Sequence, residues 1–221
     1  MRISIIIPAL NEADGIAHCL TRALAANPHE VIVVDGGSSD ATCEIAGQFD
    51  CQVLRSRPGR ARQQNHGAQQ ASGEVLLFLH ADSWLASVGL QEIRHALANP
   101  RIEFGAFQHC IEARGLIYRL IERGDTLRAR ILRMAYGDQG IFVRRALFDQ
   151  LGGFPVVGLM EDVLLVRKLR RFSPLVVLPG PLHTSARRWG KYGPVRQTLR
   201  NWSLLLAEAL GVHPDILARY Y

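Results

Sequence analysis

A histidine and an aspartate follow one of the most apolar runs in the chain. Val75 to Leu79 is an apolar run of the length and type expected for a strand that is covered on both faces. His80 and Asp82 come directly after it, and residues two apart on an extended chain point to the same side. A histidine nitrogen and a carboxylate placed in this way could bind one metal ion or phosphate. The alternative is a strand that simply ends in polar residues.

Polar or charged residues also follow each earlier predicted strand. They are Asn11 and Glu12 after the first, Asp35 at the end of the second, and Gly59 and Arg60 after the third. The carboxyl ends of parallel strands meet at one edge of a sheet, where ligands bind in a crevice. Together these groups could bind a nucleotide. Each also has a simpler explanation, because Asp35 before Gly36 suits an ordinary turn and Asn11 suits a helix cap.

The elements that must position these residues alternate regularly over the first hundred residues. We predict strands at 3–8, 30–35, 51–56 and 75–80, each followed by a helix, at 11–27, 40–49, 60–72 and 87–98. Apolar, β-branched strands that alternate with helices predict an α/β fold, with a mostly parallel twisted sheet and helices on both faces. The chain has neither a dinucleotide-binding glycine fingerprint nor a Walker A sequence, which disfavours oxidoreductases and P-loop enzymes.

The alternation changes after Pro100. Further strands are expected at 101–113, within 136–143 and at 174–180, with helices at 115–135, 144–151 and 160–172 and a C-terminal helical region from about residue 189. The chain has no internal repeat and no long linker. It therefore predicts one domain over 1–221, made of a nucleotide-binding half (1–100), an acceptor or catalytic half (101–190) and a C-terminal helical extension (191–221).

The positive charge lies in the second part of the chain. Residues 1–100 carry 7 Arg and 10 Asp or Glu, a net −3, whereas residues 101–221 carry 19 Lys or Arg and 10 Asp or Glu, a net +9. This asymmetry favours an anionic ligand or surface, but no nucleic-acid-binding pattern accompanies it, so no nucleic acid partner is expected. The basic helix at 115–134 could be a solvated face or could rest on anionic lipid.

The expected location is the cytoplasm, with peripheral membrane contact left open. No run approaches the roughly 18 apolar residues of a membrane span, and the apolar start is too short for a signal peptide. The four cysteines are scattered, without a C-x-x-C pair, which indicates reduced thiols.

Seven stretches of the chain, in order, resemble the family 2 glycosyltransferases of the GT-A fold. They are IIIPALNEADGI, EVIVVDGGSSDAT, GRARQQNHGA, VLLFLHADS, YGDQGIFVRR, LGGFPVVGLMEDVLLVRKLRR and TSARRW. The last three also resemble one bacterial branch, described as arsenosugar-biosynthesis-type glycosyltransferases. The resemblance implies inverting transfer of a sugar from a nucleotide-diphosphate donor, a uridine one, to an acceptor hydroxyl, assisted by Mn²⁺ or Mg²⁺. The acceptor could be a small metabolite, a saccharide or a lipid.

By this resemblance, most of the strand ends contact the donor. Asp82 matches the last carboxylate of the family's D-x-D motif, which binds the metal. His80 stands in place of the first carboxylate, which commonly touches the ribose, and could donate to a ribose hydroxyl or ligate manganese. The other implied donor residues are Pro8, Asn11 and Glu12 at the nucleoside, Asp35 and Gly36 at the base, and Gly59, Arg60, Asn65 and one or both of Arg187 and Arg188 at the diphosphate.

The resemblance places the chemistry on the acceptor side. Glu161 and Asp162 match an acidic pair whose aspartate is the general base in inverting members, although acidic residues also suit the start of a helix. Asp138 and Gln139 are expected to line the acceptor pocket, but Asp138 could merely form a turn. Trp189 could stack on a substrate ring or only pack.

Two other functions remain open on the sequence. A nucleotidyltransferase of similar fold would need a glycine-rich, lysine-bearing phosphate loop near the N-terminus, which the sequence lacks. A catalytically inactive nucleotide-sugar-binding module is disfavoured by Asp35, Asp82 and Asp162, but His80 in the D-x-D position keeps it open.

Overall fold

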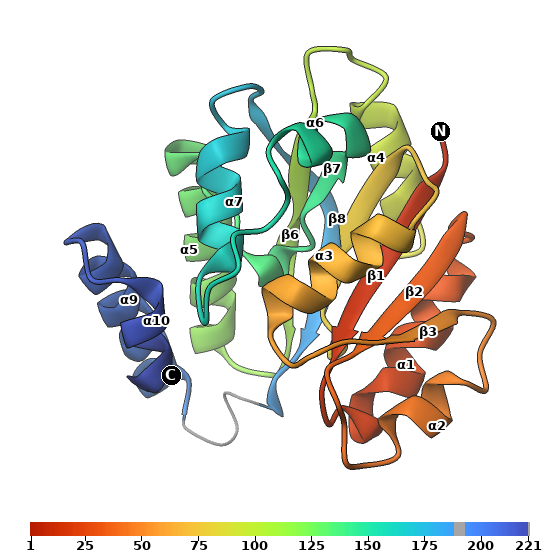
Figure 1. Ribbon diagram of the computed structural model, residues 1–221. Coiled ribbons are helices and arrows are strands. Elements are labelled where there is room, and N and C mark those ends of the chain that lie inside the picture. The colour runs from red at the N-terminus through yellow and green to blue at the C-terminus, as the bar shows by residue number, and fades with distance from the viewer. Residues whose placement is uncertain (188–192, 221) are drawn as a thin grey trace.

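The computed structural model describes residues 1–187 and 193–220, which form one curved sheet with helices on both faces (Figure 1). The sheet has eight strands in the order β3-β2-β1-β4-β7-β6-β8-β5. The strands are β1 (Ile3–Ala9), β2 (Glu30–Asp35), β3 (Gln52–Arg55), β4 (Val75–Phe78), β5 (Ser83–Leu85), β6 (Phe104–Glu112), β7 (Phe142–Arg144) and β8 (Leu175–Ser185). Strand β7 is antiparallel to β4 and β6, β5 is antiparallel to β8, and the other pairs are parallel. The predicted mostly parallel α/β sheet is confirmed.

The helices pack against the sheet through two apolar clusters, one on each face. They are α1 (Ala13–Ala25), α2 (Thr42–Ala46), α3 (Arg60–Gln70), α4 (Gly89–Ala96), α5 (Leu116–Leu132), α6 (Arg145–Gln150), α7 (Glu161–Leu169), α9 (Pro194–Ala209) and α10 (Pro214–Leu217), with short 3₁₀ turns at Gly137–Gln139 and Ala218–Tyr220. Alternate residues of a strand point to opposite faces. Ile5 and Ile7 of β1 accordingly lie in the cluster with α1 and α4, and Ile6 lies in the cluster with α3, α6 and α7.

Two predicted elements differ clearly from the structure, and one strand was not predicted. The helix expected at 40–49 is shorter, and the strand expected at 174–180 continues to Ser185. Its pairing with β6 shifts register between Phe107 and His109, opposite the segment that contains Pro179 and Pro181, because proline cannot donate to a strand ladder. Strand β5 was not predicted, since three residues are too few to show a strand pattern. It carries the chain directly from Asp82 into contact with β8.

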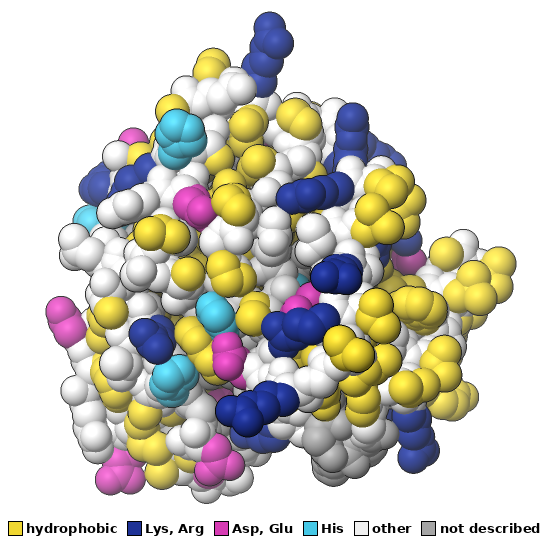
Figure 2. All heavy atoms as spheres, turned by 180° about the vertical axis from the view of Figure 1, so that it is seen from behind, with side chains coloured by type: hydrophobic (Ala, Val, Ile, Leu, Met, Phe, Trp, Pro, Cys, Tyr) yellow, Lys and Arg dark blue, Asp and Glu magenta, His cyan; other side chains and the backbone are white. Residues whose placement is uncertain are grey.

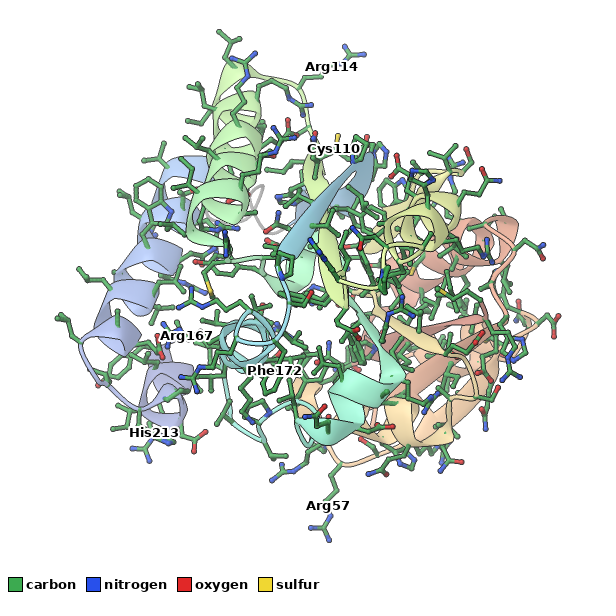
Figure 3. The ribbon with its side chains drawn as sticks, turned by 90° about the horizontal axis from the view of Figure 1, so that it is seen from above. Arg57, Cys110, Arg114, Arg167, Phe172 and His213 are labelled. Atoms are coloured by element: carbon green, nitrogen blue, oxygen red, sulfur yellow. The ribbon has the colours of Figure 1, made fainter. Side chains whose placement is uncertain are left out.

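Helices α9 and α10 lie at one side of the molecule, next to α5 and α7 (Figure 1). Arg167 of α7 donates two hydrogen bonds to Glu208 of α9, at 2.5 and 2.6 Å, and Figure 3 shows Arg167 between these helices. Leu204 of α9 and Leu217 of α10 join the apolar cluster on the α7 face of the sheet. Within the described residues, no helix has both the length and the apolar character needed to cross a membrane.

Candidate active site

A cavity of about 170 Å³ opens where β4 ends and α7 begins. Its lining contains five of the residues predicted from separate parts of the sequence, namely Arg60, His80, Asp82, Asp138 and Asp162. Residues from both halves of the chain therefore meet at the carboxyl end of the parallel strands, where α/β sheets bind ligands.

Asp82 is held at the junction between β4 and β8. Its side chain is largely buried and accepts a hydrogen bond from the Ser83 hydroxyl at 3.4 Å. Its backbone carbonyl accepts from the Ser185 N–H at 3.0 Å. Because β5 pairs with β8 directly after Asp82, the end of β8 is drawn beside the HAD sequence. This pairing brings the TSAR segment to the cavity.

Glu12 and Arg187 form an ion pair between the start of α1 and the end of β8. A guanidinium N–H of Arg187 donates to the Glu12 carboxylate at 2.5 Å, and this hydrogen bond raises the pKa of Arg187. Asp82 also adds to the negative field on Arg187. The two residues, expected to contact the nucleoside and the diphosphate, thus form an ion pair that joins the first and last predicted blocks. Arg188 and Trp189 lie outside the described residues.

Asp35 lies in a separate hollow, which Arg55, Cys43 and Ser38 also line. It accepts hydrogen bonds from the backbone N–H groups of Gly37 (2.9 Å) and Ser38 (3.1 Å). Burial raises the pKa of Asp35, but the hydrogen bonds from Ser38 and Gly37 outweigh it and hold the pKa below its usual value. The carboxylate is therefore kept ionised and fixed in direction.

Asn11 connects the two loops beside this hollow. Its side-chain oxygen accepts from the Ser39 N–H at 2.9 Å, and its backbone N–H donates to the Ser38 hydroxyl at 2.9 Å. Its φ of 54° is in the left-handed region, which asparagine tolerates better than most residues. The helix begins after Glu12, so Asn11 is not its cap; it holds the β1–α1 loop against the β2–α2 loop.

Three other predicted donor residues shape the backbone. A Cβ at Gly36 would lie 3.1 Å from the amide of Gln63, which donates to the carbonyls of Ala9 and Val34 at 2.8 Å. Gly36 therefore lets α3 approach the ends of β1 and β2 closely. Gly59 has a φ of 130° and immediately precedes α3, and Pro8 lies within β1.

The side-chain amides of Asn65 and Gln139 form hydrogen bonds with other residues of the protein. Asn65 donates to the Phe154 carbonyl at 2.8 Å and accepts from the Phe154 N–H at 2.9 Å. Gln139 is fully buried, donates to the Phe107 carbonyl at 3.2 Å and accepts from Arg128 at 2.9 Å. Neither residue is part of the cavity lining. Both residues hold the fold through these bonds, and the contacts predicted for them, with the diphosphate and the acceptor, stay predictions.

Asp162 is fixed by two backbone groups at the start of α7. Its Oδ2 accepts from the Gly137 N–H at 2.5 Å, and its Oδ1 accepts from the Val163 N–H at 2.8 Å. A Cβ at Gly137 would lie 2.9 Å from His80 Nε2 and 3.1 Å from Asp162 Oδ2, so glycine lets both side chains come close. Met160, directly before the acidic pair, has a strained φ of 63°. No sequence pattern had indicated this strained position.

Glu161 lies behind the cavity and not in its lining. It is 2% exposed and lies 3.3 Å from a guanidinium nitrogen of Arg60. Burial raises the pKa of Glu161 more than the charge of Arg60 lowers it. Glu161 therefore links α7 to the start of α3, which places Arg60 at the cavity.

The sequence reasoning missed a group of charged residues at the cavity, most of them largely buried. His109 Nδ1 lies 3.0 Å from Asp125, and Arg128 donates to the same carboxylate at 2.6 Å. The Arg128 guanidinium also lies 3.6 Å from the centre of the Tyr136 ring. Burial raises the pKa of Asp138, whose Oδ1 is buried and accepts no hydrogen bond from the part of the chain that the structure describes. The one visible signal was the three-residue spacing of Asp125 and Arg128 on a helix.

The residues at Asp82 fit a metal ion that the donor helps to bind. In the described residues, the cluster of three ligand-type side chains within 4.8 Å of one another is Cys110, Glu112 and His183, and it does not include Asp82. Mg²⁺ in nucleotide enzymes is usually held by one or two carboxylates together with phosphate oxygens and water. A single carboxylate in a cavity that Arg60 also lines matches this arrangement.

A mostly parallel GT-A sheet with acidic residues at its strand ends is the architecture of nucleotide-sugar transferases. The chain belongs to the family described as "Glycosyl transferase family 2", which matches residues 4–151. The match does not distinguish the arsenosugar-type branch, which stays a prediction.

The relatives are glycosyltransferases, most of them longer. Glycosyltransferase AglE of Haloferax volcanii is 37% identical over 91 residues, which cover 36% of this chain and 30% of AglE. The matches span about a third or less of the length of the first curated relatives. S. aureus TarS, solved with UDP-GlcNAc, has a TM-score of 0.67 at 22% identity over 84% of this chain and 58% of that one. The mannosyltransferase PcManGT of Pyrobaculum calidifontis, solved with GDP-Man and Mn²⁺, has a TM-score of 0.70 at 20% identity over 99% and 68%. These structures show the shared GT-A fold.

Proposed function

We propose that the protein transfers a sugar from a nucleotide-diphosphate donor, a UDP-sugar, to an acceptor hydroxyl with inversion at the anomeric carbon. The observation that carries this proposal is the shared cavity of Arg60, Asp82 and Asp162 at the strand ends of a family 2 chain. It supplies a cation, a metal-binding carboxylate and a base within one space. The structures of TarS with UDP-GlcNAc and PcManGT with GDP-Man support a nucleotide-sugar donor of either base.

In this proposal, the donor lies across residues 1–100. The base or ribose lies near Asp35, whose carboxylate is fixed by the Gly37 and Ser38 N–H groups. The diphosphate lies at the central cavity, which is lined by Arg60 and by Ser185, two residues before Arg187. The two arginines stabilise its negative charge. A Mn²⁺ or Mg²⁺ ion held by Asp82, when bound, would further neutralise charge on the leaving diphosphate. Arg187 would exchange part of its contact with Glu12 for the diphosphate.

The acceptor lies on the opposite side of the cavity, against residues of 101–190. Its oxygen forms a bond to the anomeric carbon while the bond from that carbon to the diphosphate breaks, and the bonding electrons leave with the nucleoside diphosphate. The proton of the acceptor hydroxyl passes to Asp162, which the Gly137 and Val163 N–H groups hold in one orientation. Attack on the face away from the leaving group inverts the anomeric centre. Asp138 lines the acceptor side of the same cavity.

Isothermal titration with UDP and GDP, each with and without Mn²⁺, tests the proposed donor site. We expect Mn²⁺ to tighten nucleotide binding, and Asp82→Ala to lose this gain, by about tenfold or more, which corresponds to about 1.4 kcal/mol. Asp149→Ala removes an exposed carboxylate on α6 and should keep the wild-type affinity.

Other outcomes would favour the alternatives. Equal affinity with and without Mn²⁺ would indicate metal-free transfer, with His80 in place of the ion. Nucleotide binding without sugar transfer or donor hydrolysis would indicate a binding module. Release of pyrophosphate from a nucleoside triphosphate and a sugar phosphate would indicate a nucleotidyltransferase.

A further inference from the structure

A second, apolar cavity of about 530 Å³ lies between α5 and α9 and continues into the first. Both cavities are lined by Ile121, Asp125, Arg128, Thr198 and Trp202. The rest of the second lining is mainly apolar and comes from the two helices. An apolar groove therefore leads from the surface to the space that contains Asp162.

Each of these two helices presents a stripe of apolar residues to solvent. Every member of both stripes is more than half exposed. The stripe on α5 is Leu116, Leu120, Leu127 and Ile131, and the stripe on α9 is Val195, Leu199, Trp202, Leu206 and Leu210. We call these nine residues the α5–α9 face. Figure 2 shows hydrophobic side chains gathered on this side of the molecule, at the right of the view. The spacing of three, four, seven or eight residues keeps each stripe on one side of its helix.

The exposed charges beside the α5–α9 face are positive. Arg123, Arg130, Arg133 and Arg196 are exposed next to the stripes, and Arg114, before α5, points away from the body of the molecule in Figure 3.

The acidic residues of the two helices point inward instead. Glu122 accepts from the Ile111 N–H and pairs with Arg119, Asp125 binds His109 and Arg128, and Glu208 binds Arg167. Apolar residues flanked by arginines match the interface of an anionic bilayer, in which hydrocarbon lies below negative headgroups.

A second copy of the chain would fit this face less well. Self-association through one patch brings the same residues of both copies together. The exposed arginines would then face one another, without exposed acidic partners on either helix. Charge complementarity therefore favours an anionic lipid surface over a symmetric dimer.

We propose that the α5–α9 face rests on an anionic lipid surface and that the groove between α5 and α9 receives the hydrocarbon chain of a lipid acceptor. This inference rests on the proposed glycosyl transfer and specifies its acceptor class. In this arrangement the hydrocarbon chain of the lipid lies along Ile117, Leu120 and Leu199. Trp202 lies where the groove meets the central cavity. The acceptor hydroxyl, at the polar end of the molecule, then reaches Asp162. Arginines around the groove bind phosphate groups of the acceptor or its neighbours.

Cosedimentation with vesicles tests the surface. We expect the purified protein to bind phosphatidylcholine vesicles that contain phosphatidylglycerol, to bind pure phosphatidylcholine vesicles less, and to be released by salt. Leu199→Glu should reduce binding to the anionic vesicles about tenfold, because it places a carboxylate in the groove against negative headgroups. Phe172→Glu is the matched control, since Phe172 is an exposed apolar residue outside the α5–α9 face, and it should bind like the wild type.

Fluorescence quenching tests the groove itself. Phosphatidylglycerol with brominated acyl chains should quench the tryptophan emission of a Trp189→Phe variant, and adding Trp202→Phe should remove most of this quenching, because the remaining tryptophan, Trp84, is packed against His18 and His183 away from the groove. Undiminished quenching in this double variant would overturn the groove assignment.

Three results would overturn the lipid surface: no preference for anionic vesicles, equal loss of binding in Leu199→Glu and Phe172→Glu, or a wild-type dimer that Leu199→Glu dissociates. All vesicle measurements are made without nucleotide. Wild-type protein that binds UDP but not vesicles refutes this inference alone, and protein that binds vesicles but no nucleotide refutes the proposed donor site instead.

Discussion

The proposed donor side and the proposed acceptor side of the central cavity are built in different ways. On the donor side, Asp35, Asp82 and Arg60 each lie within a few residues of a strand end, and backbone N–H groups or one neighbouring side chain hold them. On the acceptor side, Asp162 and Asp138 come from separate elements and lie among buried charges that bind one another. The donor site follows from strand order, whereas the acceptor site depends on how α5, α7 and the Gly137–Gln139 turn pack together.

The two proposed sides also differ in how specific each must be for its ligand. Nucleoside diphosphates share their phosphates and ribose, so a regular set of strand-end loops can serve many donors. Acceptors differ, and the elements around the acceptor side also carry the positive charge of the chain and the exposed apolar stripes. We therefore expect changes on the acceptor side to alter catalysis and acceptor binding, and changes in donor-side scaffolding to alter stability.

The largest effect is expected at Asp162. Asp162→Asn keeps the shape of the side chain but removes the proton acceptor, so sugar transfer should fall by about 10²–10⁴-fold. The affinity for UDP should change little, because Asp162 is proposed to contact the acceptor and not the nucleotide. Single-turnover transfer assays, with UDP titration in parallel, measure the two effects separately.

Asp149→Asn makes the same chemical change on the exposed surface of α6 and should keep full activity. If Asp162→Asn retained wild-type turnover, the general base would have to be another group. A parallel loss of UDP affinity would instead place Asp162 on the donor side and break the comparison between the two sides.

The elements that carry the proposed donor side were easier to predict from the sequence than the packing of the proposed acceptor side, for a physical reason. Most predicted donor residues lie at or just after the end of a predicted strand, so His80 and Asp82 could be placed at the sheet edge. Tertiary packing, which has no local sequence pattern, determines two other contacts. They are the contact of His109 with Asp125 and the hydrogen bond from Gln139 to the Phe107 carbonyl. At Asn65, the sequence predicted the helix that contains the residue but gave no sign that its amide binds the Phe154 backbone.

The second prediction concerns this donor-side scaffold. Asn65→Ala leaves the partly buried N–H and carbonyl of Phe154 without their side-chain partner, which should lower the free energy of unfolding by about 1–3 kcal/mol. The UDP affinity of the folded protein should remain unchanged, because the Asn65 amide binds the Phe154 backbone and not the nucleotide. Urea denaturation measures the first effect and titration at low temperature measures the second.

Gln69→Ala changes an exposed amide on the same helix and should leave the stability unchanged within about 0.5 kcal/mol. A large loss of UDP affinity in Asn65→Ala, with normal stability, would indicate that Asn65 contacts the diphosphate. The distinction between scaffold and ligand contacts on the donor side would then fail.

The smallest expected effect concerns the ionisation of Asp138 on the acceptor side. Because burial raises the pKa of Asp138, the folded protein holds this proton more tightly than the unfolded chain does. The contribution of Asp138 to stability is therefore most favourable below the ordinary carboxyl pKa and is lost as the pH rises through the higher folded value. Asp138→Asn removes this loss, so it should raise the Tm of the protein at neutral pH. Each kcal/mol gained in the free energy of unfolding corresponds to about 2–4 °C in Tm.

Thermal unfolding from pH 4 to pH 8 checks the sign of this effect. The gain in Tm of Asp138→Asn over the wild type should shrink as the pH falls toward 4 and Asp138 takes up its proton in the folded protein, and Asp149→Asn should show no such trend. A constant gain at every pH would mean that Asp138 does not ionise in the folded protein over this range. A gain confined to neutral pH, together with reduced sugar transfer, would show that the acceptor side keeps a destabilising buried charge because the reaction uses it.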